Sequence, residues 1–169
     1  MRHIIFLVAV TLAASNAFAQ RFEAGGFAGT GGFSTGSGGN SYWVVGADAC
    51  VRCNRKIAFY GEYSHFDAVS LPSIDRVDLG SVGARFQGRL DRRVRPFFDA
   101  GLSFGMQHES RNVQNPRDQS LVGVGFGGGA TVNLGSRFYV RPAIRLHILS
   151  PGGSPNAAVA GGASVGLRF

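Results

Sequence analysis

The most reactive side chains in this sequence belong to two cysteines separated by two residues. Cys50 and Cys53 enclose Val51 and Arg52, and a redox pair with this spacing needs a helix N-terminus to stabilise a thiolate. The flanking residues predict two strands joined by a tight turn. Asn54 stands where haem attachment requires histidine, and the sequence has no second ligand pair for zinc. The favoured interpretation is a structural disulfide between Cys50 and Cys53, with free thiols or transient redox chemistry as the alternatives.

Histidines and serines are the other residues that could do chemistry. His147 and Ser150 lie three residues apart, but acyl transfer needs a serine, a histidine and an acid within hydrogen-bond reach. A second group, His108, Glu109 and Ser110, falls on a predicted loop where the side chains would be solvated. We therefore predict no catalytic residues, no metal site and no cofactor.

The composition narrows the fold class in which these residues must be placed. The 169 residues include 26 Gly and 14 Phe, with 44% hydrophobic and 16% charged residues. Each interior glycine would cost a helix about 1 kcal/mol, and a chain with this apolar content is not disordered. No apolar run reaches the ~18 residues that a membrane-spanning helix needs. The sequence therefore predicts an all-β protein.

Residues 1–19 have the pattern of a cleaved secretory signal peptide. A basic start at residues 2–3 precedes an apolar stretch over 4–14 and a small-x-small ending at Ala19. We predict cleavage after Ala19, which leaves a single domain over residues 20–169. Export excludes nucleic acid as the expected partner, although the formal net charge is +7.

In the rest of the chain, apolar residues mostly recur at every second position, which is typical of half-buried strands. Each run is about ten residues long, as a tilted strand needs to cross a bilayer. Short turns are predicted at 51–55, 88–93 and 133–136, and longer segments at 30–40, 67–75, 106–119 and 150–157. This alternation favours an eight-stranded antiparallel transmembrane β-barrel with both termini on the periplasmic side. The predicted strands cover residues 21–29, 41–50, 56–66, 76–87, 94–105, 120–132, 137–149 and 158–169.

The face opposite the apolar one carries charged residues. Near the bilayer midplane a charge facing lipid costs several kcal/mol, whereas inside an eight-stranded barrel charges can pair and fill the lumen. His65 and Asp78 break the pattern, but both fall near outer strand ends, where this cost is small. The predicted lumen charge network is Glu23, Asp48, Glu62, Arg85, Asp99, Arg141, Arg145 and Arg168.

Further basic residues gather at two predicted periplasmic turns, where they are either solvated or meet the phosphates of lipid headgroups. One group is Arg52, Arg55 and Lys56, and the other is Arg89, Arg92, Arg93 and Arg95.

Aromatic residues cluster near both ends of the predicted strands, as in the girdles of membrane barrels. A soluble periplasmic lipocalin-like carrier stays open as an alternative, because in that fold the charged face would be the outer one. The predicted girdles are Trp43, Tyr63 and Phe104 on the outer side and Phe22, Phe86, Phe98 and Phe138 on the inner side.

The last predicted strand alternates Val165, Leu167 and Phe169 and ends on an aromatic residue. This pattern resembles the signal by which outer-membrane proteins are recognised for assembly. With the signal peptide and the eight strands, residues 20–169 resemble the small outer-membrane barrels, the group of the OmpA transmembrane domain, OmpX and the opacity-type porin-family proteins.

The resemblance implies location in the outer membrane of a Gram-negative-type envelope, in contact with outer-membrane lipid and lipopolysaccharide. It also implies assembly by the BAM machinery with periplasmic chaperones, and we expect a monomer. We predict a non-enzymatic structural or surface-interaction role with a lumen filled by side chains. The alternatives are a narrow pore for small solutes and a lipid A-modifying barrel enzyme.

Overall fold

The structure is a computed structural model that describes residues 22–35, 38–52, 56–69, 74–89, 93–109, 118–150 and 156–169. The predicted signal peptide over residues 1–19 and its cleavage site lie outside these ranges. Within the described residues, no helix is long and apolar enough to span a membrane.

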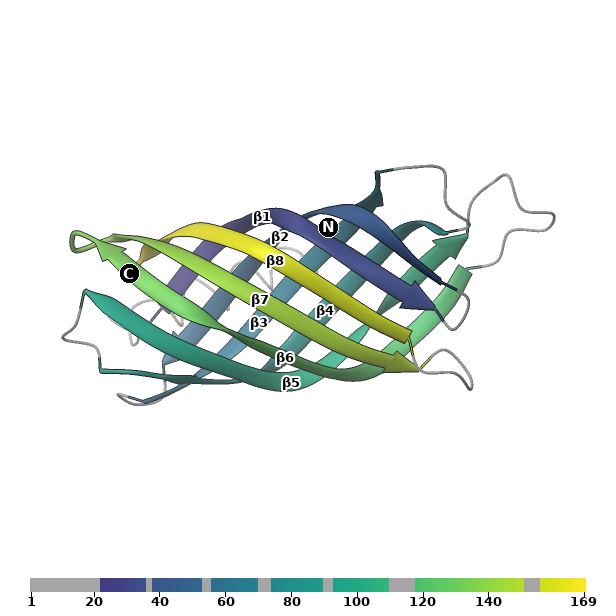
Figure 1. Ribbon diagram of the computed structural model, residues 1–169. Coiled ribbons are helices and arrows are strands. Elements are labelled where there is room, and N and C mark those ends of the chain that lie inside the picture. The colour runs from purple at the N-terminus through teal and green to yellow at the C-terminus, as the bar shows by residue number, and fades with distance from the viewer. Residues whose placement is uncertain are drawn as a thin grey trace, which may run out of the picture.

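Eight antiparallel strands form a closed barrel in which every strand pairs with its neighbours along the chain (Figure 1). The first and last strands pair from Glu23–Arg168 to Ser34–Ala157 and close the cylinder. The predicted all-β, eight-stranded antiparallel barrel is therefore confirmed. The strands are β1 (Phe22–Thr35), β2 (Gly38–Arg52), β3 (Ile57–Ala68), β4 (Ile74–Gln87), β5 (Val94–Glu109), β6 (Asp118–Leu134), β7 (Phe138–Ser150) and β8 (Asn156–Arg168).

The strands are longer than the apolar alternation predicts. Pairing runs through most of the predicted loop 30–40, so that only residues 36–37 separate β1 from β2. A sheet is held by backbone hydrogen bonds, which glycine- and serine-rich ends make without any apolar side chain. The predicted strict alternation of short and long connections is also wrong, since the connection 88–93 is longer than 36–37 at the opposite end.

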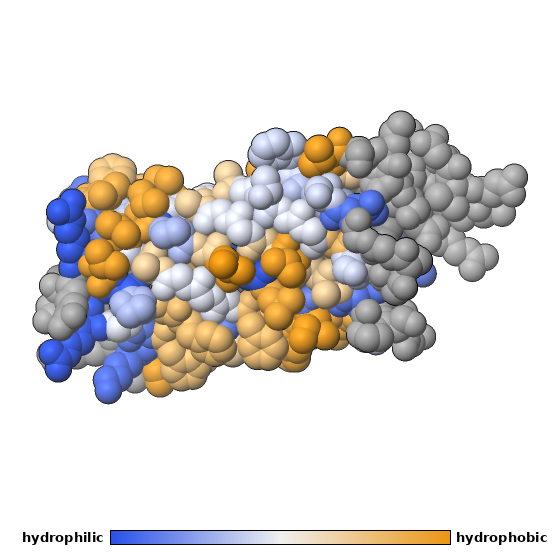
Figure 2. All heavy atoms as spheres, viewed as in Figure 1, coloured by the Kyte–Doolittle hydropathy of each residue, from blue (hydrophilic) through white to orange (hydrophobic). Residues whose placement is uncertain are grey.

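Side chains alternate strictly between the lumen and the outer wall. In β7 buried and exposed positions follow one another without a break, with Ile144 66% exposed and Arg145 4% exposed. Figure 2 shows hydrophobic residues across the visible outer wall and hydrophilic ones gathered at one end of the barrel. Because the charged face is the inner one, the lipocalin-like alternative, which needs it outside, is wrong.

Turn geometry also uses glycine. The hairpin between β6 and β7 places Gly135 at φ 88°, a left-handed conformation that residues with a side chain rarely adopt. This turn covers residues 135–137 and lies at the same end of the barrel as the C-terminal end of β8.

The closing seam between β1 and β8 depends on a close approach of two backbones. Gly29 pairs with Gly162, and a Cβ on Gly162 would lie 2.3 Å from the carbonyl oxygen of Ala28. We expect Gly162→Ala to lower the free energy of unfolding by about 1–3 kcal/mol, because the seam must shift to admit the methyl group. Gly161→Ala is the matched control, since its Cβ would meet nothing within 4 Å. Urea unfolding in lipid vesicles measures both, and equal losses would contradict the close approach.

Candidate functional site

The lumen is filled by two layers of side chains, one polar and one apolar. Phe169 N donates to Phe22 O at 2.9 Å, so the two ends of the described chain lie side by side. We call this end of the barrel the terminal end and the opposite one the far end. The polar layer occupies the terminal half of the lumen, and the apolar layer occupies the far half.

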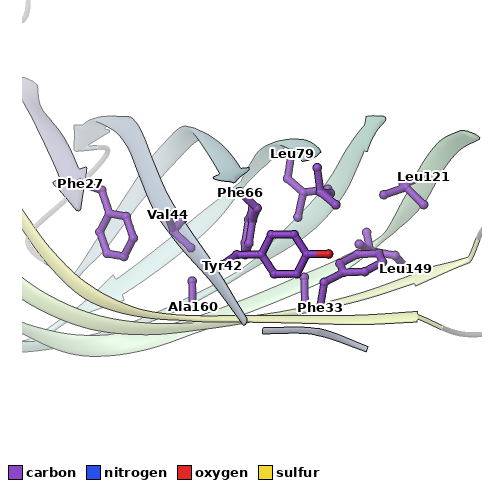
Figure 3. Packing of buried hydrophobic residues seen from close by; sticks show 11 residues of the cluster. Phe27, Phe33, Tyr42, Val44, Phe66, Leu79, Leu121, Leu149 and Ala160 are labelled. Atoms are coloured by element: carbon purple, nitrogen blue, oxygen red, sulfur yellow. The ribbon is translucent and has the colours of Figure 1, made fainter. Parts of the chain in front are cut away.

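The apolar layer is built from residues of seven strands, and all except Phe27, which lies near the middle of β1, belong to the far halves of their strands. Figure 3 shows their side chains directed toward one another across the lumen. The Tyr42 and Phe66 rings meet edge to face, with centroids 6.3 Å apart. The layer consists of Phe27, Phe33, Tyr42, Val44, Phe66, Val77, Leu79, Leu121, Leu149, Ala158 and Ala160. Sequence reasoning missed it because it looked for charged residues on the lumen face and placed Phe33 in the predicted loop 30–40. Phe33 lies an even number of residues from Glu23 and therefore on the same face of β1.

The polar layer holds all eight charged residues of the predicted network, which the structure places on the lumen side. Two more arginines join them, so that four carboxylates face six guanidinium groups. The acids are Glu23, Asp48, Glu62 and Asp99, and the bases are Arg52, Arg85, Arg95, Arg141, Arg145 and Arg168.

Glu23 is the centre of this layer. Its carboxylate accepts hydrogen bonds from Arg52, Arg95, Arg141 and Arg168. Arg95 Nη2 and Arg168 Nε lie 3.1 and 3.0 Å from Glu23 Oε1. Because the four arginines come from β2, β5, β7 and β8, this carboxylate links distant parts of the wall at the terminal end.

Asp48 is tied to Glu23 through a shared arginine. Arg141 Nη1 donates to Asp48, its Nη2 donates to Glu23, and its Nε donates to Thr131 Oγ1 at 3.0 Å. Asp48 also accepts a hydrogen bond from Ser164 Oγ at 2.8 Å. The guanidinium is therefore satisfied on all three nitrogens, which orients it rigidly between two carboxylates.

The other two acids each have an arginine as their main partner, and both arginines also lie within 4.0 Å of Asp48. Asp99 binds Arg85 in a bidentate manner, at 2.7 and 2.8 Å, and the Arg85 guanidinium also lies 4.7 Å from the centroid of the Phe97 ring. Glu62 binds Arg145 Nε at 2.9 Å. Both arginines are almost fully buried, so these charges are compensated by fixed partners and not by bulk water.

The placement of Arg52 and Arg95 corrects the prediction that they belong to exposed turns. Arg52 is the last residue of β2, and Arg95 is the second residue of β5. Both side chains point into the lumen, with residue exposures of 7% and 1%. Arg52 is an even number of residues from Asp48 on β2, and Arg95 is an even number from Asp99 on β5, so alternation places each arginine on the lumen face. The sequence contained this signal, but the neighbouring basic residues led to the assignment of both arginines to turns.

His147 contacts a serine, but not the one considered from the sequence. Ser150 faces outward, whereas His147 faces the lumen and lies 2.9 Å from Ser103 Oγ through Nδ1. Its Nε2 is 3.9 Å from Glu62 Oε1, beyond hydrogen-bond distance. The serine, histidine and acid meet in the barrel centre, buried between the two layers, where a lipid acyl chain has no access.

Among the residues that the structure describes, Cys50 has no disulfide partner. It faces the lumen, is 2% exposed, and its Sγ lies 3.7 Å from Glu23 Oε2. Cys53 lies outside the described residues, so the disulfide stays a prediction.

The two residues that broke the apolar pattern form a polar cluster on the outer wall. His65 Nδ1 lies 2.7 Å from Asp78 Oδ1, and Tyr63 OH donates to the same oxygen. His108 joins the cluster at 3.4 Å from Asp78 and 2.9 Å from Asp118. The prediction that His108 and Glu109 lie on a loop is wrong, because both belong to β5.

Most of the predicted girdle residues point outward and are exposed, and Phe22 is partly buried at the start of β1. Phe169 follows β8 and packs against Phe22 with ring centroids 6.0 Å apart. Val165 and Leu167 face outward on β8. Their recognition as an assembly signal stays a prediction. The exposed girdle residues are Trp43, Tyr63, Phe86, Phe98, Phe104 and Phe138.

The closed barrel, the apolar wall and the charged interior together have the design of a membrane barrel of the outer-membrane type. The family model described as outer membrane protein beta-barrel domain matches residues 4–169. The chain belongs to this family. Membership in the outer-membrane barrel family indicates the outer membrane as the protein's location. The comparison with curated proteins finds none that matches the chain.

Solved structures of small outer-membrane barrels share the fold. Neisserial surface protein A is 17% identical with a TM-score of 0.78, over 88% of this chain and 97% of that one. The N-terminal barrel of Pseudomonas aeruginosa OprF is 16% identical with a TM-score of 0.63, over 89% and 98%. Ail, the attachment invasion locus protein of Yersinia pestis, is 17% identical with a TM-score of 0.62, over 88% and 99%.

Proposed function

We propose that this member of the outer-membrane barrel family is a non-enzymatic integral membrane protein that acts through its outer surfaces. The observation that carries the proposal is the filled lumen, in which an apolar layer lies next to a layer of paired carboxylates and arginines. Side chains that fill a barrel stabilise it and leave its loops and wall as the surfaces that meet other molecules. The roles named for Neisserial surface protein A and for Ail agree with such a function.

The orientation follows from the way such barrels are built. The terminal end faces the periplasm and the far end faces the outside, since membrane barrels keep both termini on the periplasmic side. The mature protein begins after Ala19, assembles through the BAM machinery with the aid of periplasmic chaperones, and is a monomer. Its wall contacts outer-membrane lipid, and its far end contacts lipopolysaccharide.

The two membrane alternatives are disfavoured by the same geometry. A narrow pore needs a continuous polar path, but Phe33, Tyr42 and Phe66 are each at most 1% exposed within the apolar layer. A lipid A-modifying enzyme needs its serine and histidine open to an acyl chain. Ser103 and His147 are 1% and 2% exposed inside the wall.

We expect the wild-type protein to give no unitary currents when it is reconstituted in planar bilayers. The apolar layer denies water a path, and moving an ion across it would carry the full cost of desolvation. The matched test opens a gap in that layer by combining Phe33→Ala and Phe66→Ala, which should produce small channel openings while the charge network stays intact. Regular openings of the wild-type protein would contradict the proposal and make the narrow pore the leading function.

A further inference from the structure

The terminal end of the lumen carries more positive charge than its carboxylates balance. Arg52, Arg95 and Arg168 all depend on Glu23 as their acidic partner among the described residues. Glu23 also binds Arg141, which Asp48 shares. The polar layer as a whole has six arginines and four carboxylates, a surplus of two positive charges. Buried charge of one sign is costly unless a counter-charge compensates it.

Two of these arginines, Arg52 and Arg95, have donors without an acceptor in the described part of the chain. Arg52 Nε and the Nε and Nη1 atoms of Arg95 are buried and make no hydrogen bond there. The side chain of Arg95 is only 1% exposed. Gln87, at the terminal end of β4, adds a further buried donor without a partner, its Nε2. An unpartnered buried donor costs about 1–3 kcal/mol, so an acceptor group at this place would lower the free energy of the folded protein.

We propose that the terminal end of the lumen binds a phosphate group, free or carried by a lipid headgroup, through Arg52, Arg95 and Arg168. A phosphate monoester or inorganic phosphate carries close to two negative charges near neutral pH, which equals the surplus of the polar layer. Its oxygens accept several hydrogen bonds, and guanidinium groups bind them with matched geometry. A carboxylate supplies one charge and two oxygens, and therefore fits the surplus less well.

Arg168 links the site to solvent. Its side chain is 19% exposed and hydrogen-bonds the buried Glu23, so it marks the edge of the site at which an anion would first bind. Exposed basic residues surround this end and would draw anions toward it. They are Lys56, Arg89, Arg93 and Arg137. Figure 2 shows the corresponding gathering of hydrophilic residues at the end of the barrel that carries the C-terminus in Figure 1.

The test uses the full mature barrel in neutral detergent and follows the phosphorus NMR linewidth of inorganic phosphate at constant ionic strength. We expect broadening by the wild-type protein and at least about tenfold weaker binding for the combined Arg52→Gln and Arg95→Gln variant, since each arginine makes charge-assisted hydrogen bonds. Arg76→Gln is the matched control, because it removes one exposed charge at the far end of β4 and should leave binding unchanged. Wild-type protein without broadening, or a double variant that binds like wild type, would overturn the proposal.

Two vesicle arms separate the sources of the phosphate. In the first, neutral vesicles receive added inorganic phosphate, and in the second, vesicles in phosphate-free buffer contain phosphatidic acid, whose headgroup is a phosphate monoester. If the phosphate source of one arm only raises the unfolding temperature of wild type more than that of the double variant, it identifies free phosphate or the lipid headgroup, respectively. No difference in either arm would overturn the proposal. If the double variant does not fold, Arg168→Gln at the partly exposed edge of the site replaces it in every measurement. The outcome is independent of the conductance experiment.

Discussion

Replacing Arg85 with Met is expected to lower the free energy of unfolding by about 3–5 kcal/mol, because it leaves a buried carboxylate without its partner. Arg85 and Asp99 form a bidentate pair at 2.7 and 2.8 Å, and their side chains are 1% and 5% exposed. Asp99→Leu should cost a similar amount by leaving the guanidinium uncompensated. Equilibrium unfolding in urea with lipid vesicles measures both variants.

The double variant Arg85→Met with Asp99→Leu decides whether the pair itself stabilises the barrel. The double variant leaves no buried charge without a partner. Its loss of unfolding free energy should therefore be far smaller than the sum of the losses of the two single variants. Ser64→Ala, at a lumen position whose hydroxyl makes no hydrogen bond in the described structure, is a matched control and should change stability by less than about 1 kcal/mol. Additive losses in the double variant would show that the two charges do not act as a pair.

Ile144→Arg should reduce the yield of assembled barrel more than any of the preceding changes. Ile144 is the central residue of β7, points outward and is 66% exposed on the apolar wall. An arginine at the bilayer midplane costs about 2–4 kcal/mol in such barrels. The fraction of protein that migrates as the compact band in unboiled gel samples, after refolding into vesicles, measures the effect.

The same arginine placed outside the lipid serves as the control. Ser136 lies in the exposed turn between β6 and β7, and Ser136→Arg should assemble like wild type. A loss of assembly for both variants would indicate a general effect of added positive charge. Equal tolerance of both would contradict the placement of Ile144 in lipid.

Much of this architecture could be read from residue alternation, because a strand places every second side chain on the same side. That rule placed Ile144 outside and Arg145 inside without any knowledge of their partners. It did not reveal the apolar layer, because Phe33 was placed in the predicted loop 30–40 and the lumen face was searched for charged residues only. It was also not applied at strand ends such as Arg95, because the neighbouring arginines led to the assignment of this residue to a turn.

The partners within the lumen could not have been predicted in the same way. Ser103 on β5 and His147 on β7 meet across the interior of the barrel, and Glu23 binds residues of four other strands. Such meetings depend on the stagger of the strands around the closed sheet, which a single sequence does not reveal. The extension of β1 and β2 through glycine and serine residues could not be predicted either, because backbone pairing leaves no pattern of apolar and polar residues.

Because Phe22 and Phe169 lie side by side, the chain could be circularly permuted. Every strand pairs with its neighbours in the sequence, and only the β1–β8 seam joins distant segments. A circular permutant that links these ends and begins between β5 and β6 would keep all eight pairings, at a loop-closure entropy that changes only slowly with the length of the new connection. Such a chain would bury the Val165–Phe169 segment in its interior sequence. Its stability would test the barrel alone, and its assembly in cells would test whether delivery to the membrane requires Val165–Phe169 at the C-terminus.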